Sequence, residues 1–333
     1  MRCGAEGETY MQNLLNPGIT IPIGDGFTIY YYAIIIVFGI ICATFVVGLL
    51  FKHRNIPVDW TLDLLLCILP LGIIGARTFF CLTDSSTSMA DWFTKFREGG
   101  LSILGGVMGG ALGVVLFCLI HKINFLRVAD CLVPGVILAQ GIGRWGNFAN
   151  QEVYGPLITN PNLQWFPLGV FIDKVQEWHY AFFFYESMLN LILFVILFVL
   201  MWKFTKKPHG LSLSIYLFGY GLVRSIMEPL RDEQFILGSV LPVSQLIAIG
   251  MFLCGILLFV AVLYFNRRKY GSAFGAAEGE PSAILPKYYT AEQRKKMEEE
   301  KRKKLSAAVA AKSVSDEKKG DVPPETEQNA KGE

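Results

Sequence analysis

Residues 141–155 carry a dense group of polar side chains directly after an apolar stretch that is long enough, with its neighbours, to lie in a membrane. The segment reads Gly-Ile-Gly-Arg-Trp-Gly-Asn-Phe-Ala-Asn-Gln-Glu-Val-Tyr-Gly. Hydrocarbon tolerates such polar groups where they face protein or water, and intramembrane charge usually has a function. The glycines let a substrate or another backbone approach closely. Two interpretations follow: a site that binds or converts a polar group, or an Arg144–Glu152 ion pair that only joins helices.

The composition indicates what surrounds this segment. Of the 333 residues, 53% are hydrophobic and only 17% are charged, which is less charge than a soluble domain of this length carries. A transmembrane helix needs about 20 mainly apolar residues. Stretches of that kind are 27–51, 60–82, 101–121, 128–148, 180–202, 211–229 and 239–266. The sequence therefore predicts an all-α, polytopic membrane protein with about seven transmembrane helices.

The short loops predict how these helices are oriented. Basic residues follow the first, third, fifth and seventh stretches, among them Lys52, Lys122, Lys203 and Arg267. The positive-inside rule then places the N-terminus outside and the C-terminus in the cytoplasm. On that topology, six charged residues lie near the outer ends of their helices: Arg77, Arg144, Glu152, Glu186, Arg224 and Glu228. A site that uses them would face the outer half of the bilayer.

Composition and spacing also predict the domains and limit the choice of cofactors. We predict a transmembrane catalytic domain over residues 1–270 and a charged, largely disordered cytoplasmic tail over residues 271–333. The seven cysteines form no CxxC pair and have no metal-like spacing with the four histidines, so no metal site is expected. Gly105, Gly109 and Gly113 recur at the four-residue step that lets membrane helices pack closely. We expect no cofactor and no nucleic-acid partner.

The segment 143–155 resembles the signature GRxGNFxNxExxG of the prolipoprotein diacylglyceryl transferase family. Further segments resemble the same family in the same order: 31–33, 62–63 with 75–77, 99–102 with 105–106, 129–130, 185–186, and 220–224 with Glu228 and Arg231. The resemblance implies a multi-pass enzyme of the bacterial cytoplasmic (inner) membrane, with seven spans and an active site towards the outer leaflet.

The resemblance also implies a reaction. The family transfers the diacylglyceryl group of phosphatidylglycerol to the lipobox cysteine thiol in the signal peptide of a prolipoprotein. A thioether forms and glycerol phosphate is released, as the first step of bacterial lipoprotein maturation. The expected partners are therefore phosphatidylglycerol, the prolipoprotein and the lipid bilayer.

The residues that match the family suit this chemistry. The departing phosphate becomes more negative, so catalysis needs cations directed at that growing charge. The planar fork of arginine binds phosphate oxygens in pairs. We expect Arg144 and Arg224 to clamp the phosphate, with Glu152 orienting Arg144. The expected substrate-binding set is Arg144, Asn147, Tyr32, Tyr220, Gly155 and Arg77.

The group that takes the thiol proton stays open at this point. A neighbouring cation favours the thiolate, and Glu152 is the alternative acceptor if it is not locked to Arg144. Leu104 stands where the family usually has His or Tyr, so no proton-transfer role is carried over to that position. His179 precedes the Tyr185–Glu186 pair by one residue more than usual, and a lone histidine is more often structural than a base.

Two functions from other classes compete with this interpretation. A transporter of anions or lipids would bind a headgroup with its arginines and carry out no chemistry. Transporters often have repeated halves, and the sequence shows no internal repeat. An intramembrane protease would need a motif such as GxSxG or HExxH, and neither occurs in the chain. Product formation in detergent would exclude the transporter.

Overall fold

The computed structural model describes residues 18–21, 27–83, 92, 100–204, 208–230, 236–237, 241–270 and 299. The long helices of this part are α2 (Tyr31–His53), α3 (Trp60–Thr83), α4 (Ile103–His121), α5 (Phe125–Ala149), α6 (Phe182–Lys203), α7 (Leu211–Met227) and α8 (Val243–Tyr270). Its strands form antiparallel hairpins: β1 (Gly18–Ile21) with β2 (Phe27–Tyr30), β3 (Gly169–Ile172) with β4 (Glu177–Tyr180), and β5 (Ile236–Leu237) with β6 (Leu241–Pro242). Short 3₁₀ turns are η3 (Pro161–Leu163) and η4 (Glu228–Leu230).

Six helices within these ranges are long and apolar enough to cross a membrane, namely α2 to α6 and α8. The predicted all-α membrane architecture is confirmed. The other expected span is α7, whose 17 residues fall slightly short of a hydrocarbon layer of about 30 Å at about 1.5 Å per residue. The turn η4 follows α7 directly. The inside and outside assignment stays a prediction. So does the domain division, because residues 271–333 lie outside the described ranges apart from Glu299.

Three helices begin a few residues later than the predicted stretches. Residues 27–30 form strand β2, paired with β1, so the first helix begins at Tyr31 and Tyr30 belongs to the hairpin. Likewise, strand β4 ends at Tyr180 and α6 begins at Phe182, and strand β6 (Leu241–Pro242) directly precedes α8. A continuous apolar run does not distinguish a strand that leads into a helix from the helix itself.

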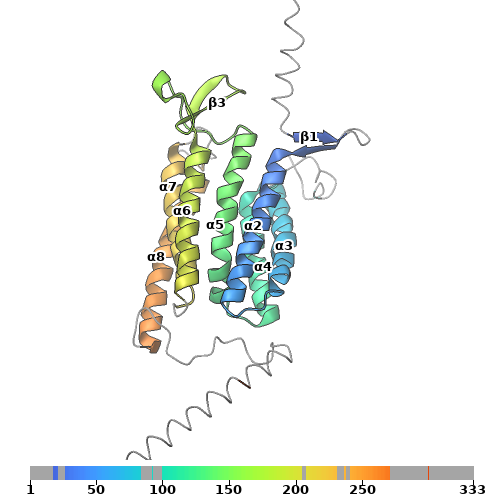
Figure 1. Cartoon of the computed structure of the whole chain (residues 1–333), viewed down its shortest axis with the longest axis vertical. Helices are drawn as coiled ribbons and strands as arrows, with labels where there is room; N and C mark the ends of the chain where they lie inside the picture. The colour runs from blue at the N-terminus through green and yellow to red at the C-terminus, as the bar shows by residue number, and fades with distance from the viewer. Residues whose placement is uncertain are drawn as a thin grey trace, which may run out of the picture. The chain divides into compact units, whose positions relative to one another are not determined.

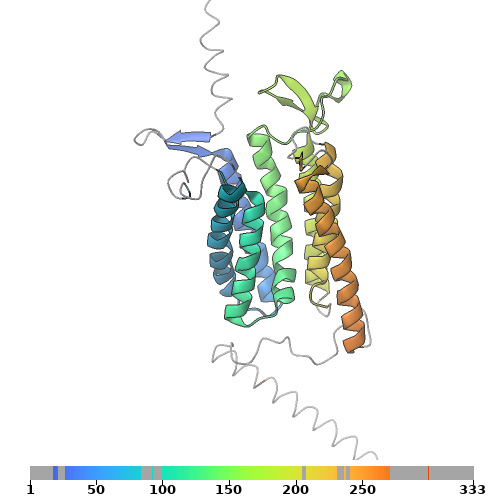
Figure 2. The same ribbon diagram turned by 180° about the vertical axis from the view of Figure 1, so that it is seen from behind.

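Figures 1 and 2 show the helices side by side, with the hairpins β1–β2 and β3–β4 at one end of the bundle. Helix α3 packs on α4, α2 on α5, α5 on α6, and α7 on α8. The helices alternate in direction, so the starts of α2, α4, α6 and α8 and the ends of α3, α5 and α7 lie at this end, which we call the hairpin end. The opposite end carries Lys52, Lys122 and Lys203, and we call it the basic end.

The glycine repeat of α4 is a packing face, as predicted. Gly105, Gly109 and Gly113 are all buried. A Cβ atom added to Gly113 would lie 2.6 Å from the carbonyl oxygen of Cys67, and one added to Gly109 would overlap the carbonyl of Leu71, both on α3. The two backbones are therefore in direct contact, which only glycine permits.

Adding one methyl group to this face should separate the two helices. We expect Gly109→Ala to destabilise the protein by about 1–3 kcal/mol, because the backbone of α3 has to move. Gly110→Ala is the matched control, since a Cβ atom there would meet only the Ile68 side chain at an ordinary 3.7 Å. Thermal unfolding of both purified variants in detergent measures the difference. Equal midpoints would contradict the packing described for α3 and α4.

Buried polar contacts join the helices at the basic end. The Asp130 carboxylate of α5 accepts hydrogen bonds of 2.9 Å from the backbone N–H groups of Gly210 and Leu213, and so caps the start of α7. Arg127 of α5 donates a 2.7 Å hydrogen bond to the carbonyl of Arg54, just after α2. Burial lowers the pKa of Arg54, while Asp130 is among the neighbours that act in the opposite direction. The cap fixes the position of α7 along the bundle axis, and therefore also the position of Arg224 along that axis.

Candidate functional site

Charged residues from three helices and the turn η4 meet at the hairpin end. Arg144 lies near the end of α5, Glu186 near the start of α6, and Arg224 near the end of α7. Glu228 begins η4, immediately after α7. Because neighbouring helices run in opposite directions, these positions reach the same height although they are far apart in sequence. We call Arg144, Glu186, Arg224 and Glu228 the arginine network.

Glu186 lies between the two arginines. Its Oε2 atom is 2.6 Å from Nη2 of Arg144 and 3.5 Å from Nη1 of Arg224. The Glu186 side chain is 1% exposed, whereas the side chains of Arg144 and Arg224 are 14% and 16% exposed. One buried carboxylate therefore holds guanidinium groups from two different helices, and both groups keep a small opening to the outside of the protein.

Arg224 also pairs with the residue one turn further on. Its Nη2 atom lies 2.6 Å from Oε2 of Glu228, and the hydroxyl of Ser244 on α8 donates a hydrogen bond to the other carboxylate oxygen. Nη1 of Arg224 is buried, and its 3.5 Å ion pair with Glu186 is too long for a good hydrogen bond. Arg224 is therefore held between two carboxylates, more tightly by Glu228 than by Glu186.

The charges of the network balance when all four groups are ionised, because two guanidinium groups face two carboxylates. A buried charge that loses its partner costs about 3–5 kcal/mol. The two glutamates therefore stabilise two charged arginines in a largely buried site before any ligand binds.

Two predicted binding residues lie on or against the last turns of α5. The ring of Tyr32 covers Gly146, where an added Cβ atom would lie only 2.7 Å from the ring. Asn147, the next residue, is half-buried. Glycine at position 146 thus allows α2 and α5 to come close beside Arg144, and brings Tyr32 to the same segment as Asn147.

Tyr220 lies one turn before Arg224 on α7. Its ring stacks on that of Tyr216, with centroids 5.7 Å apart and planes within 9°. The Tyr216 hydroxyl is hydrogen-bonded to Gln140 of α5. This contact joins α5 and α7 on the side of the arginine network that faces the basic end. The stacking on Tyr216 orients the Tyr220 ring.

Gly155 connects α5 to the hairpin β3–β4. Its N–H donates to the carbonyl of Tyr180, and its own carbonyl accepts a 2.8 Å hydrogen bond from Nδ1 of His179. A Cβ atom at Gly155 would lie 2.6 Å from the ring of Phe182, the first residue of α6. His179 is 5% exposed, and its ring lies against that of Tyr154. The expectation of a structural histidine agrees with these contacts.

Arg77 lies in a different environment from the other two arginines. It is 1% exposed and donates hydrogen bonds to the carbonyls of Trp92, at 3.2 Å, and Gly100, at 3.0 Å. Both acceptors lie in the connection between α3 and α4. The guanidinium also lies 5.8 Å from the ring centre of Phe80. Arg231, another residue of the resemblance, lies outside the described residues.

The expected Arg144–Glu152 pair is wrong. Helix α5 ends at Ala149, and the next residues turn away from it, with Gln151 in a left-handed conformation at a φ of 51°. Glu152 is exposed, and its backbone N–H donates to the carbonyl of Asn147. The carboxylate that pairs with Arg144 is Glu186 instead.

The sequence places Glu186 near the outer end of its helix, but outside the expected catalytic and substrate-binding residues. The structure gives this residue a central position between the two arginines. The next residue, Ser187, adds a second link between α5 and α6, because its hydroxyl accepts from the indole N–H of Trp145 and donates to the carbonyl of Gly141. A carboxylate at the start of a span, opposite the arginine of the preceding span, was the signal that could have identified it.

Fold and site together define a polytopic membrane protein with a buried arginine–glutamate network near one end of its helix bundle. The sequence model of the family described as prolipoprotein diacylglyceryl transferase matches residues 19–261. The chain belongs to this family of transferases, and the resemblance found on the signature is confirmed.

Curated relatives are similar along most of the chain. The phosphatidylglycerol–prolipoprotein diacylglyceryl transferase 1 of Clostridium perfringens (strain 13 / Type A) is 33% identical over 265 residues, which are 78% of this chain and 99% of the relative. The corresponding enzyme of Finegoldia magna is 35% identical over 240 residues, 70% of this chain and 91% of the relative. That of Lactococcus lactis subsp. cremoris is 36% identical over 236 residues, with shares of 70% and 89%.

Proposed function

We propose that this chain transfers the diacylglyceryl group of phosphatidylglycerol to the lipobox cysteine thiol of a prolipoprotein, at the outer leaflet of the bacterial cytoplasmic membrane. The names of its relatives supply the two substrates, phosphatidylglycerol and a prolipoprotein. One observation carries the assignment of the site: arginines from two helices converge on the buried carboxylate of Glu186. Guanidinium forks fixed from two directions suit a phosphate group.

At the reacting carbon, one bond forms and one bond breaks. The cysteine sulfur attacks the glycerol carbon that carries the phosphate, so a C–S bond forms and the C–O bond to the phosphate breaks. The thiol proton goes to an acceptor, and glycerol phosphate leaves with the bonding electron pair. The phosphate is more negative in the transition state than in the bound lipid. Fixed cations beside it therefore lower the barrier, and Arg144 and Arg224 are the residues assigned to this role.

Glu186 is a positioning residue in this proposal. Each guanidinium has five N–H donors, and the contacts with Glu186 involve Nη2 of Arg144 and Nη1 of Arg224. Other donors of both groups can turn to phosphate oxygens while the carboxylate holds the forks in place. Glu228 does the same for Arg224 alone, since its Oε2 contacts Nη2.

The remaining predicted binding residues take secondary roles around this clamp. Asn147 and Tyr220 are assigned as additional donors, because each lies within a turn or so of one of the two arginines on its helix. Tyr32 is assigned to the headgroup pocket through its contact with Gly146. Gly155 is bonded to Tyr180 and His179 of the hairpin β3–β4, and Arg77 to the carbonyls of Trp92 and Gly100, so both also have a structural role.

Two explanations remain for the fate of the thiol proton, namely ionisation favoured by the two arginines and transfer to Glu152. An unperturbed thiol has a pKa near 8.5, and two nearby cations favour its ionised form. Glu152 is exposed and does not pair with Arg144, so its carboxylate is available as a proton acceptor. Leu104, on the first turn of α4, has an aliphatic side chain that can neither donate nor accept a proton.

The proposed orientation rests on the two ends of the bundle. The arginine network lies at the hairpin end, and the basic loops lie at the opposite end. The positive-inside rule assigns the basic end to the cytoplasm. Phosphatidylglycerol would therefore be bound from the outer leaflet, where an exported prolipoprotein presents its cysteine.

The transfer should occur with purified protein in detergent micelles. We expect a lipobox peptide to gain the diacylglyceryl group from phosphatidylglycerol, with release of equal amounts of glycerol phosphate, whereas the same peptide with Ser in place of Cys gains nothing. Mass spectrometry of the peptide and assay of glycerol phosphate measure the two products. Movement of phosphatidylglycerol across sealed vesicles without lipidated peptide would instead favour the transporter.

A further inference from the structure

A groove of about 530 Å³ lies between α2 and α3, in the half of the bundle towards the basic end. The two helices follow each other in the chain but touch little. Ile41, Phe45 and Leu62 border the groove and are 61%, 67% and 62% exposed, so it opens sideways to the surroundings of the bundle. The groove is separate from the arginine network, because Tyr32, which contacts Gly146, lies at the other end of α2.

The length of the groove matches one leaflet of a bilayer. On α2 it extends from Ile40 to Lys52, which is about 18 Å at about 1.5 Å per residue. Half of a hydrocarbon layer of about 30 Å is about 15 Å. The lining is apolar over most of this length, and charge appears only at the basic end, in Lys52 and Asp59. A lipid with its headgroup at the basic end has the same order, a polar end followed by an apolar chain.

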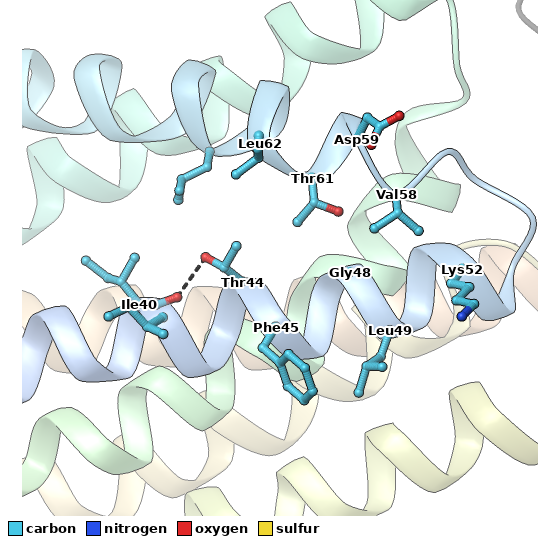
Figure 3. Close-up of a pocket in the computed structure, with 12 residues that line it drawn as sticks. Ile40, Thr44, Phe45, Gly48, Leu49, Lys52, Val58, Asp59, Thr61 and Leu62 are labelled. Carbon is cyan, nitrogen blue, oxygen red and sulfur yellow. Dashed lines mark hydrogen bonds between the residues drawn. The ribbon is translucent and has the colours of Figure 1, made fainter. Parts of the chain in front are cut away.

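Two polar groups stand where a glycerophospholipid has complementary ones. Lys52 is exposed and forms no ion pair within the described ranges. In Figure 3 the Asp59 side chain points away from α2, and Thr61 projects from α3 towards Gly48. Thr61 is 6% exposed, and its hydroxyl has no hydrogen-bond partner among the described residues. Gly48 lies one turn before Lys52, so the unpaired hydroxyl lies deeper in the bundle than the cation.

We propose that the groove binds one acyl chain of an anionic glycerophospholipid from the leaflet at the basic end. The lipid phosphate binds Lys52, an ester carbonyl accepts the hydrogen bond of Thr61, and the chain fills the space beside Gly48. A lysine near the membrane surface attracts anionic headgroups. The lipid is a resident of the α2–α3 gap rather than a substrate, because the arginine network lies at the opposite end.

Photolabelling tests this site without any use of transfer activity. The full chain is reconstituted in phosphatidylcholine vesicles with a trace of phosphatidylserine or phosphatidylcholine that carries a diazirine on its acyl chain. Labelled peptides are then mapped by mass spectrometry. We expect the phosphatidylserine probe to label residues 40–65 about fivefold more than the phosphatidylcholine probe, the preference that one lysine provides. Lys52→Gln should remove this preference.

A leucine in the groove provides the second arm. Gly48→Leu should reduce labelling of residues 40–65 about fivefold, because its side chain occupies the space of the acyl chain. Gly250→Leu on α8 is the matched control, since nothing lies within 4 Å of a Cβ atom there, and it should leave the labelling unchanged. Equal labelling by the two probes, or full labelling of Gly48→Leu, would overturn the proposal. If Gly48→Leu does not fold, the comparison of probes in wild-type protein and Lys52→Gln decides alone.

Discussion

Replacing Arg144 or Arg224 with lysine is expected to lower kcat/KM for diacylglyceryl transfer by about 10- to 100-fold in each case. Lysine keeps the positive charge but presents a single ammonium group in place of a planar fork. The loss of one hydrogen bond to a charged phosphate oxygen is worth about 1.5–3 kcal/mol, and about 1.4 kcal/mol corresponds to a factor of ten in rate. Initial rates in micelles at varied phosphatidylglycerol concentration measure the effect.

Lysine in these two positions should leave the fold intact, because a cation still faces Glu186. Thermal unfolding of both variants provides that check. Arg268→Lys near the end of α8 is a matched control, since Arg268 is exposed at the basic end and lies outside the arginine network. Its kcat/KM should equal that of the wild-type protein. If Arg144→Lys and Arg224→Lys also retained full activity, neither arginine would act as a bidentate phosphate ligand.

The second large effect is expected for Glu186→Gln. This substitution keeps the size of the side chain but removes the buried charge that two guanidinium groups share. Loss of one partner of a buried ion pair costs about 3–5 kcal/mol, so the midpoint of thermal unfolding should fall markedly. Glu177→Gln, the matched control, changes a carboxylate that is 52% exposed and lies 3.5 Å from Nε2 of His179, and it should shift stability by no more than about 1 kcal/mol.

Kinetics distinguish positioning from a purely structural role for Glu186. At a temperature where Glu186→Gln remains folded, we expect kcat/KM to fall at least 100-fold. The guanidinium groups of Arg144 and Arg224 both lose their fixed orientation in this variant, whereas a substitution of either arginine affects one group. Glu152→Gln separates the two candidate partners of Arg144. It should preserve stability, because Glu152 is exposed and does not pair with Arg144. A stable, active Glu186→Gln beside a destabilised Glu152→Gln would restore the pair expected from the sequence.

The sequence alone predicted the features that depend on composition and on short motifs. Long apolar stretches predicted the helices, and the spacing of Gly105, Gly109 and Gly113 predicted the close contact of α4 with α3. The signature located Arg144 near the end of α5. These features are local, so that one helix or one segment contains the information needed to recognise them.

Features that depend on how helices face each other could not be predicted in the same way. The partner of Arg144 is decided by the rotation of α6, which brings Glu186 towards α5, and by the end of α5, which removes Glu152 from that face. Likewise, the cap that Asp130 provides for α7 joins residues from two helices. Strands β2, β4 and β6 were missed because they lead almost directly into α2, α6 and α8.

A double-mutant cycle tests most directly whether Arg144 and Arg224 act on one phosphate through one network. The measurement is kcat/KM for transfer in micelles by wild-type protein, by Arg144→Lys, by Arg224→Lys and by the protein with both substitutions. Groups that share a ligand and the Glu186 carboxylate are coupled by about 0.5–3 kcal/mol. We therefore predict that the double variant loses clearly less activity than the product of the two single losses. Losses that multiply without coupling would contradict a shared phosphate site.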